Sequence, residues 1–193
     1  MLKIGLTGGI GSGKSTVAKL LRAMNYPVYE SDERAKNLLN NNTRIHQLIE
    51  ASFGDEVFDN FGKPVREKLA EKVFSNPSDL EKLNAIIHPA VREDFIEWSK
   101  KQNSNIIFKE AAIIFEHGLE KDLDEVWVVD APETTRIERV MARSNITETQ
   151  IRQRMKNQLN PHVLLDKADR IITNDEHSAL IPQVLKAIRS LSI

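Results

Sequence analysis

A glycine-rich segment near the start of the chain, GGIGSGKS (residues 8–15), constrains the fold more than any other part of the sequence. Glycine loses more conformational freedom on folding than other residues, so the four glycines between Gly8 and Gly13 weaken any helix or strand that contains them. A strand-like run, KIGLT (residues 3–7), precedes the segment. Apolar residues at helical spacing follow it, namely Val17, Leu20, Leu21 and Met24. The sequence therefore predicts a loop of bare backbone between a strand and a helix.

Residues 8–15 match the pattern G-x-x-x-x-G-K-[ST] in the strand–loop–helix context that the pattern requires. Bare backbone lets N–H groups approach phosphate oxygens at the positive end of the helix dipole. Lys14 would reach the terminal phosphates, and the Ser15 hydroxyl would be placed to bind Mg²⁺. We expect a nucleoside triphosphate to be bound by Gly11, Ser12, Gly13, Lys14, Ser15 and Thr16.

The alternative is a glycine-rich turn that only happens to end in Gly-Lys-Ser, but strand, loop, lysine and helix all agree with the first interpretation. Gly9 and Gly11 add conformational freedom beyond the two glycines of the pattern. The pattern alone does not separate a kinase from an ATPase or a GTP-driven switch.

Short apolar runs rich in valine, isoleucine and aromatic residues alternate with helical patterns along the chain. These runs are typical of buried strands and cover residues 3–7, 27–31, 105–111, 125–131 and 170–173. Helix starts are indicated by Asn76-Pro77 and Asn160-Pro161, and by a capping box at Thr147-x-x-Gln150. The alternation predicts an α/β fold with a five-stranded parallel sheet covered on both faces.

Residues 33–104 interrupt this alternation with a long, mainly helical and charged stretch. A single crossover helix does not need that length. We therefore predict an inserted helical subdomain that shapes a binding site.

Acidic residues close several of the strand-like runs, and in an open parallel sheet the ligand lies beyond those ends. Asp32 follows the second run, where a carboxylate can orient an attacking hydroxyl and take its proton. Capping of the next helix explains Asp32 equally well. Glu110 in the third run or Glu116 after it would assist Mg²⁺ through water. Asp130 closes the fourth run and is more simply an acid favouring the start of a helix near Pro132.

Two consecutive predicted helices carry basic residues. The first has Arg136, Arg139 and Arg143 at i, i+3 and i+7, with Ile137, Val140 and Met141 on another face. The second carries Arg152, Arg154 and Lys156. A charged helical face is usually solvated, yet two such helices beside a phosphate loop also suit guanidinium groups that close over phosphates.

His88 precedes Pro89 in the insertion. Its role stays undecided, because no second histidine lies at the sequence spacing of a metal-ligand pair.

Composition limits the functional classes. The 193 residues are 40% hydrophobic and 28% charged with a net charge of −1, so no overall basic field favours nucleic acid. The absence of cysteine excludes disulfides and thiolate chemistry and is compatible with a reducing compartment. We expect no signal peptide, no membrane span and a cytoplasmic location.

Longer stretches resemble the dephospho-CoA kinase family nearly from end to end. IGLTGGIGSGKSTVA is similar to that family's phosphate loop, Ser31-Asp32 to the segment with its catalytic aspartate, and His88-Pro89 to a pair in its substrate-side helices. Further similar segments are EAAIIFE (110–116), RIERVMAR (136–143), RMKNQ (154–158) and ADRIITND (168–175). The chain departs from the family where Arg136 replaces a frequent glutamine, Ala112-Ile113 replaces proline-leucine and Glu110 replaces a common aspartate.

This resemblance implies ATP-dependent phosphorylation of the ribose 3′-hydroxyl of dephospho-CoA with Mg²⁺, the final step of coenzyme A biosynthesis. It implies catalytic roles for Lys14, Asp32 and Arg143, nucleotide contacts by Arg139 and Asn174, and substrate contacts by Asp32 and His88. It also implies a P-loop core over 1–32, 105–135 and 161–193, a substrate-binding insertion over 33–104 and an arginine-bearing lid over 136–160. The oligomeric state is left open.

Three other functions compete with this one. Another kinase of the nucleoside-monophosphate-kinase-like group would differ in its acceptor. A GTP-binding switch typically needs an N-K-x-D guanine-reading motif, which the sequence lacks. A nucleic-acid-dependent ATPase is disfavoured by the net charge and by the absence of basic tracts.

Overall fold

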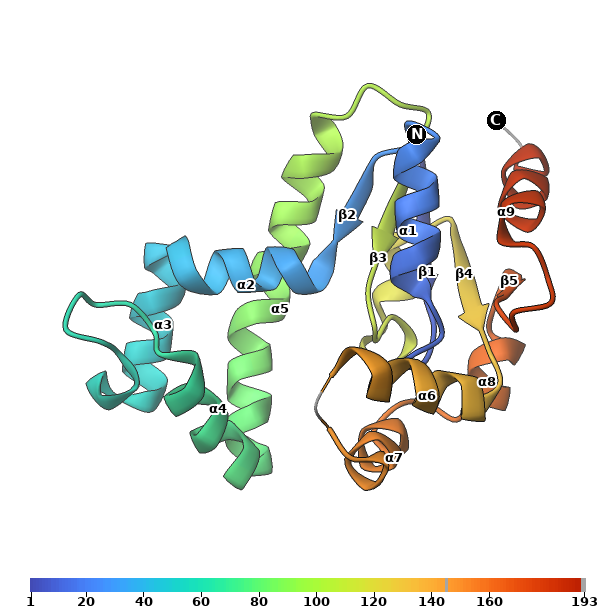
Figure 1. Cartoon of the computed structure of the whole chain (residues 1–193). Coiled ribbons are helices and arrows are strands. Elements are labelled where there is room, and N and C mark those ends of the chain that lie inside the picture. Colours follow the sequence, from blue (N-terminus) through green and yellow to red (C-terminus); the bar gives the residue numbers. More distant parts are fainter. Residues whose placement is uncertain (145, 192–193) are drawn as a thin grey trace. The chain divides into compact units, whose positions relative to one another are not determined.

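The computed structural model describes residues 1–144 and 146–191. They form two compact units. The sheet unit comprises residues 1–30 and the described residues from 102 onward, and the helical unit comprises Ser31–Lys101. Figure 1 traces both along the chain.

The sheet unit is built on five parallel strands in the order β2-β3-β1-β4-β5 among the described residues. The strands are β1 (Leu2–Thr7), β2 (Val28–Glu30), β3 (Ile106–Glu110), β4 (Glu125–Asp130) and β5 (Arg170–Thr173). The predicted parallel sheet is confirmed, and each predicted run ends within one residue of its strand. The prediction succeeds because parallel strands buried on both faces appear in the sequence as nearly continuous apolar runs.

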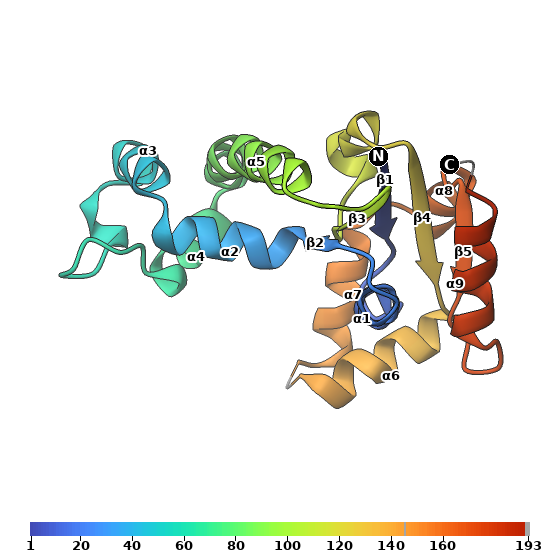
Figure 2. The ribbon, with the colours of Figure 1, turned by 90° about the horizontal axis from the view of Figure 1, so that it is seen from above.

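Helices and short turns cover both faces of this sheet. The helices are α1 (Lys14–Ala23), α6 (Glu133–Arg143), α7 (Glu148–Lys156), α8 (Pro161–Asp166) and α9 (Leu180–Arg189), with 3₁₀ turns η2 (Phe115–His117) and η3 (Leu119–Asp122). Helices α1 and α9 share one core cluster with the sheet, and Figures 1 and 2 show both helices along it. On the opposite face Ile114 and Leu123 lie so close to Gly5 that a Cβ there would come within 3 Å of each.

The helical unit has its own hydrophobic core. It contains α2 (Ser31–Asn41), α3 (Thr43–Phe53), η1 (Asp55–Val57), α4 (Arg66–Ser75) and α5 (Pro77–Lys100). Ile45, Ile49 and Phe53 of α3 pack against Leu69 and Val73 of α4. Figure 2 shows these helices from above. The unit covers residues 31–101, whereas the predicted insertion covers residues 33–104.

Helix caps follow the sequence signals. The Asn76 side chain accepts a hydrogen bond from the Ser78 N–H, and that of Asn160 accepts one from the His162 N–H. Thr147 and Gln150 form the predicted capping box at the start of α7. Near Pro132 the first-turn acid of α6 is Glu133, and Asp130 lies two residues before the N-cap Pro132.

No helix in the described part of the chain is long and apolar enough to cross a membrane.

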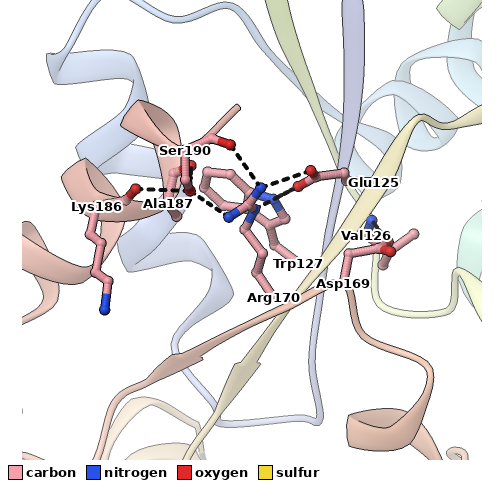
Figure 3. A network of polar contacts seen from close by, with 8 residues as sticks. All are labelled: Glu125, Val126, Trp127, Asp169, Arg170, Lys186, Ala187 and Ser190. Carbon is pink, nitrogen blue, oxygen red and sulfur yellow. Dashed lines mark hydrogen bonds and ion pairs between the residues drawn. The ribbon is translucent and has the colours of Figure 1, made fainter. Parts of the chain in front are cut away.

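A polar network fastens the ends of β4, β5 and α9 together (Figure 3). Arg170 Nε and Nη2 donate to the two carboxylate oxygens of Glu125 at 2.7 and 2.8 Å. Trp127 Nε1 donates to the same carboxylate, and Arg170 also donates to the Ser190 hydroxyl beyond α9. Asp169 Oδ2 accepts a hydrogen bond from the Val126 N–H at 2.7 Å. Asp169 and Arg170 of the ADRIITND segment therefore stabilise the pairing of β4 and β5 in this unit.

Replacing Arg170 with methionine is expected to lower the free energy of unfolding by about 2 kcal/mol at pH 7, between the values for exposed and fully buried ion pairs. The hydrogen bond from Arg170, followed by that from Trp127, holds the pKa of Glu125 below its ordinary value. A depressed carboxyl pKa stabilises the fold above the ordinary pKa and loses that effect as pH falls. The difference between parent and variant should therefore shrink below about pH 4.3.

Urea denaturation at pH 7 and pH 3.5 measures this difference. Lys36→Met is the control, because its ion pair with Glu33 is exposed and should contribute little. A difference that persists unchanged at pH 3.5 would show that Arg170 stabilises through packing and its hydrogen bond to Ser190, and not through its ion pair with Glu125.

Candidate active site

The glycine-rich segment lies at the junction between β1, which ends at Thr7, and α1, which begins at Lys14. Gly8, Gly11 and Gly13 have φ values of +151°, +80° and +96°, a region that side-chain-bearing residues rarely adopt. No acidic residue occupies the first turn of α1, so no side-chain carboxylate there competes for the positive end of the helix. The predicted strand–loop–helix junction is confirmed, and its geometry suits an anion.

Gly9 and Gly11 allow α6 to approach the loop. A Cβ at Gly9 would lie 2.0 Å from Nη1 of Arg136, and one at Gly11 would lie 2.3 Å from the Arg136 carbonyl oxygen. Besides adding conformational freedom, Gly9 therefore makes room for a neighbouring side chain. Gly11 combines a left-handed φ with a close backbone contact.

Gly11→Ala is expected to lower the free energy of unfolding by about 3 kcal/mol, because it adds overpacking against α6 to left-handed strain. Gly62→Ala is the matched control, since Gly62 has φ +72° and no atom within 4 Å of a Cβ. That control should lose only about 1 kcal/mol. Urea denaturation compares the two, and equal losses would rule out a rigid contact between the loop and α6.

The predicted nucleotide-binding residues surround the start of α1. Lys14 Nζ donates to the Gly8 carbonyl oxygen at 3.0 Å, which holds the ammonium group at the loop. Ser15 and Thr16 are exposed in the first helical turn, whereas Ser12 is buried. The Ser15 hydroxyl is a hard oxygen donor of the kind that Mg²⁺ accepts. No three histidine or acidic side chains in the described ranges gather into a metal-binding group.

Asn174 and Arg139 lie beside this loop. Asn174 Nδ2 donates to the Ser12 carbonyl oxygen at 2.8 Å, so Asn174 fixes the loop against the end of β5. Arg139 Nη2 lies 3.5 Å from Asn174 Oδ1 and 3.4 Å from Glu176 Oε1, while its Nη1 is buried without a partner. The structure thus brings both predicted nucleotide contacts to the loop, and Asn174 also positions it.

Helix α6 does not present a uniformly solvated row of arginines. Arg136 is only 7% exposed, Arg139 is half-buried and Arg143 is exposed at the last helical position. Ile137 and Val140 pack with Ile151 of α7, as an apolar face should. Met141 was assigned to that face but is 48% exposed. The helical period predicts an apolar and a charged face correctly. It does not predict which residues at the border between them are buried, because that depends on the segment packed against the helix.

Two hydrogen bonds connect the segment after α7 to other parts of the sheet unit. Gln158 Oε1 accepts a hydrogen bond from the Ile10 N–H of the glycine loop at 2.8 Å. Glu116 Oε1 accepts one from the Leu159 N–H at 3.1 Å. Helical period and residue spacing predict no role for Gln158, and the resemblance of RMKNQ to the family segment is the sequence signal at this position. Glu110 is the last residue of β3, and the structure does not decide between Glu110 and Glu116 as the acid that assists Mg²⁺.

A cavity of about 370 Å³ lies where these segments meet. Its lining includes Gly8 and Gly9 of the loop, Ala112 after β3, and residues of α6, α7 and the segment that follows. Arg136, Arg152 and Lys156 supply positive charge. The hydrogen bonds that Arg152 donates to Glu148, and next to Glu133, raise its pKa, and the bond to Glu133 joins α7 to α6. The cavity adjoins the phosphate loop, and its three basic side chains outnumber the two carboxylates in its lining, Glu116 and Glu133, which favours a phosphorylated ligand.

Asp32 and His88 belong to the helical unit. Asp32 is exposed in the first turn of α2, two residues after the end of β2. His88 lies half-buried within α5, before Pro89. Their roles therefore stay predictions.

The sheet order, the loop at the first strand–helix junction and the basic cavity define a P-loop protein that handles phosphoryl groups. A family model described as "Dephospho-CoA kinase" matches residues 2–179. A dephospho-CoA kinase of Porphyromonas gingivalis is 40% identical over 192 residues, which cover 99% of this chain and 95% of that protein. The chain belongs to the dephospho-CoA kinase family.

Solved structures agree with this fold. The crystal structure of a Thermus thermophilus protein shares 32% identity with a TM-score of 0.84, covering 98% of this chain and 95% of that one. Dephospho-CoA kinase from Campylobacter jejuni has 24% identity and a TM-score of 0.70, covering 97% of this chain and 95% of that one.

Proposed function

We propose that this chain transfers the γ-phosphoryl group of ATP to the ribose 3′-hydroxyl of dephospho-CoA, giving CoA and ADP. The observation that carries the proposal is family membership over residues 2–179. The phosphate loop at the β1–α1 junction supports the same activity. In the reaction a bond forms between the ribose oxygen and the γ-phosphorus, the bond from that phosphorus to the leaving oxygen of ADP breaks, and the hydroxyl proton is removed.

Backbone N–H groups and Lys14 bind the phosphates of ATP in this proposal. The loop glycines allow close approach of phosphate oxygens, and the Lys14 ammonium group neutralises charge on the phosphoryl group as it moves. Arg139, whose Nη1 is buried without a partner beside the loop, adds a second cation toward the nucleotide. Arg143, exposed at the end of α6, contributes from the mobile lid predicted over residues 136–160.

Mg²⁺, when bound, neutralises phosphate charge and orients the terminal phosphates. Ser15 is the residue that would hold it directly. Glu110, at the carboxyl end of β3, or Glu116, which follows it, would hold it through water.

Asp32 and His88 act on the acceptor in this proposal. A carboxylate two residues beyond β2 suits a group that orients the ribose hydroxyl and accepts its proton. His88 contributes to binding of dephospho-CoA by the helical unit. The cytoplasmic location expected from the sequence is a further prediction.

An assay of ADP release with a panel of acceptors tests the function. Dephospho-CoA should support fast release, with CoA recovered by chromatography, whereas nucleoside monophosphates, shikimate and water should support little. Phosphorylation of another acceptor in preference to dephospho-CoA would contradict the proposal and favour a different kinase of the same fold.

A further inference from the structure

Arg136 places a buried guanidinium group directly against the phosphate loop. The residue is only 7% exposed although it lies on α6, a helix with several exposed positions. A Cβ at Gly9 would lie 2.0 Å from its Nη1, so the group touches the backbone of the loop. Its Nε is buried and has no hydrogen-bond partner.

Arg136 forms no ion pair with a carboxylate within residues 1–144 and 146–191. Two acidic residues line the same cavity, but both have other partners. Glu133 pairs with Arg152, and Glu116 accepts its hydrogen bond from the Leu159 N–H. A buried charge without a partner is costly, so such a group favours binding of an anion that restores the balance.

The cavity beside Arg136 has the charge and position for such an anion. It is bounded on the loop side by Gly8 and Gly9. Lys14 Nζ donates to the Gly8 carbonyl oxygen, and Arg136 touches Gly9, so two cations flank one peptide unit. Guanidinium groups bind phosphate oxygens with strong, charge-assisted hydrogen bonds.

We infer that Arg136 is a further phosphoryl-binding residue, which contacts a phosphoryl group in the cavity beside Gly8 and Gly9. The inference rests on the proposed kinase function and extends it to a residue to which the family resemblance gave no role and whose helical spacing suited a solvated face as well as a phosphate contact. The phosphoryl group belongs either to the end of bound ATP or to the diphosphate of the acceptor. The two sources share the same chemistry and predict different measurements.

Arg136→Gln and Arg136→Lys test the inference, with Arg44→Gln as the control because Arg44 is exposed on α3. Calorimetry measures the affinity for ADP and for a non-hydrolysable ATP analogue, each with Mg²⁺. Steady-state kinetics measures the KM for dephospho-CoA. Loss of a charge-assisted hydrogen bond weakens binding by roughly 10- to 100-fold.

If Arg136 contacts the terminal phosphoryl group of ATP, Arg136→Gln loses at least about 10-fold in affinity for the analogue and less than about 3-fold for ADP. If it contacts the acceptor, both nucleotide affinities hold and the KM for dephospho-CoA rises by at least about 10-fold. Arg136→Lys keeps the charge in the cavity and should lose less in the same measurement, which provides a readout if the glutamine variant folds poorly.

Equal losses for ADP and the analogue with an unchanged acceptor KM would overturn the inference, because Arg136 would then only support the shape of the loop. Unchanged values throughout would overturn it as well. The calorimetric arm uses no acceptor, so a parent chain that ignores dephospho-CoA would contradict the proposed function while leaving the comparison of ADP with the analogue valid.

Discussion

Replacing Lys14 with alanine is expected to lower the turnover number by at least about 10³-fold, because the migrating phosphoryl group loses the cation that stabilises its developing charge. The structure holds this ammonium group at the loop through its 3.0 Å hydrogen bond to the Gly8 carbonyl oxygen. Turnover is measured with saturating ATP, Mg²⁺ and dephospho-CoA, and ATP affinity is measured separately by calorimetry.

Lys19→Ala is the matched control for this experiment, since Lys19 is an exposed lysine on the same helix. It should retain the parent turnover, which separates loss of the loop ammonium group from a general loss of positive charge on α1. A Lys14→Ala variant with near-parental turnover at saturating ATP would exclude Lys14 from the transfer step.

The central part of the fold could be predicted because local signals and tertiary structure agree there. The apolar runs at residues 105–111 and 125–131 form β3 and β4. Such continuous apolar runs are typical of parallel strands that are buried on both faces. The capping box at Thr147 reports a helix start through hydrogen bonds that lie entirely within four residues. The phosphate loop likewise combines its glycines, lysine and hydroxyl in one continuous segment.

The arrangement around the loop could not be predicted in the same way, because it depends on segments far apart in sequence. The i, i+3 spacing of Arg136 and Arg139 is compatible with a solvated face, and only the packing of α6 on Gly9 and Gly11 buries the first of them. Gln158 binds the Ile10 N–H across 148 positions of sequence, a contact that no periodicity reports. Glu116 accepts a hydrogen bond from the Leu159 N–H, 43 positions away in sequence, which its place after the third strand-like run does not predict.

Residues of one family-like segment also have different roles in the structure. In ADRIITND, Asp169 and Arg170 hold β4 and β5 together, and Arg170 reaches Ser190 beyond α9. Asn174 instead reaches the phosphate loop through the Ser12 carbonyl oxygen. The same segment therefore stabilises the edge of the sheet through Asp169 and Arg170 and positions the phosphate loop through Asn174.

Replacing Asp32 with asparagine is expected to lower the turnover number by at least about 10²-fold while ATP affinity stays nearly unchanged. Asparagine keeps the size of the side chain and some hydrogen bonding but cannot accept the ribose proton. The phosphoryl-transfer transition state is loose, so this carboxylate mainly orients the acceptor hydroxyl and takes its proton late.

Glu33→Gln is the matched control, because Glu33 lies next to Asp32 in the first turn of α2 and is likewise exposed. Removing either acid weakens the interaction with the helix dipole by a similar small amount, so a helix-capping role for Asp32 predicts similar small effects in both variants. Calorimetry with ATP and chromatography of CoA formation separate nucleotide binding from transfer. If Asp32→Asn binds ATP normally and makes CoA at the parental rate, Asp32 only favours the start of α2 as a first-turn acid, and the acceptor hydroxyl must lose its proton to another group.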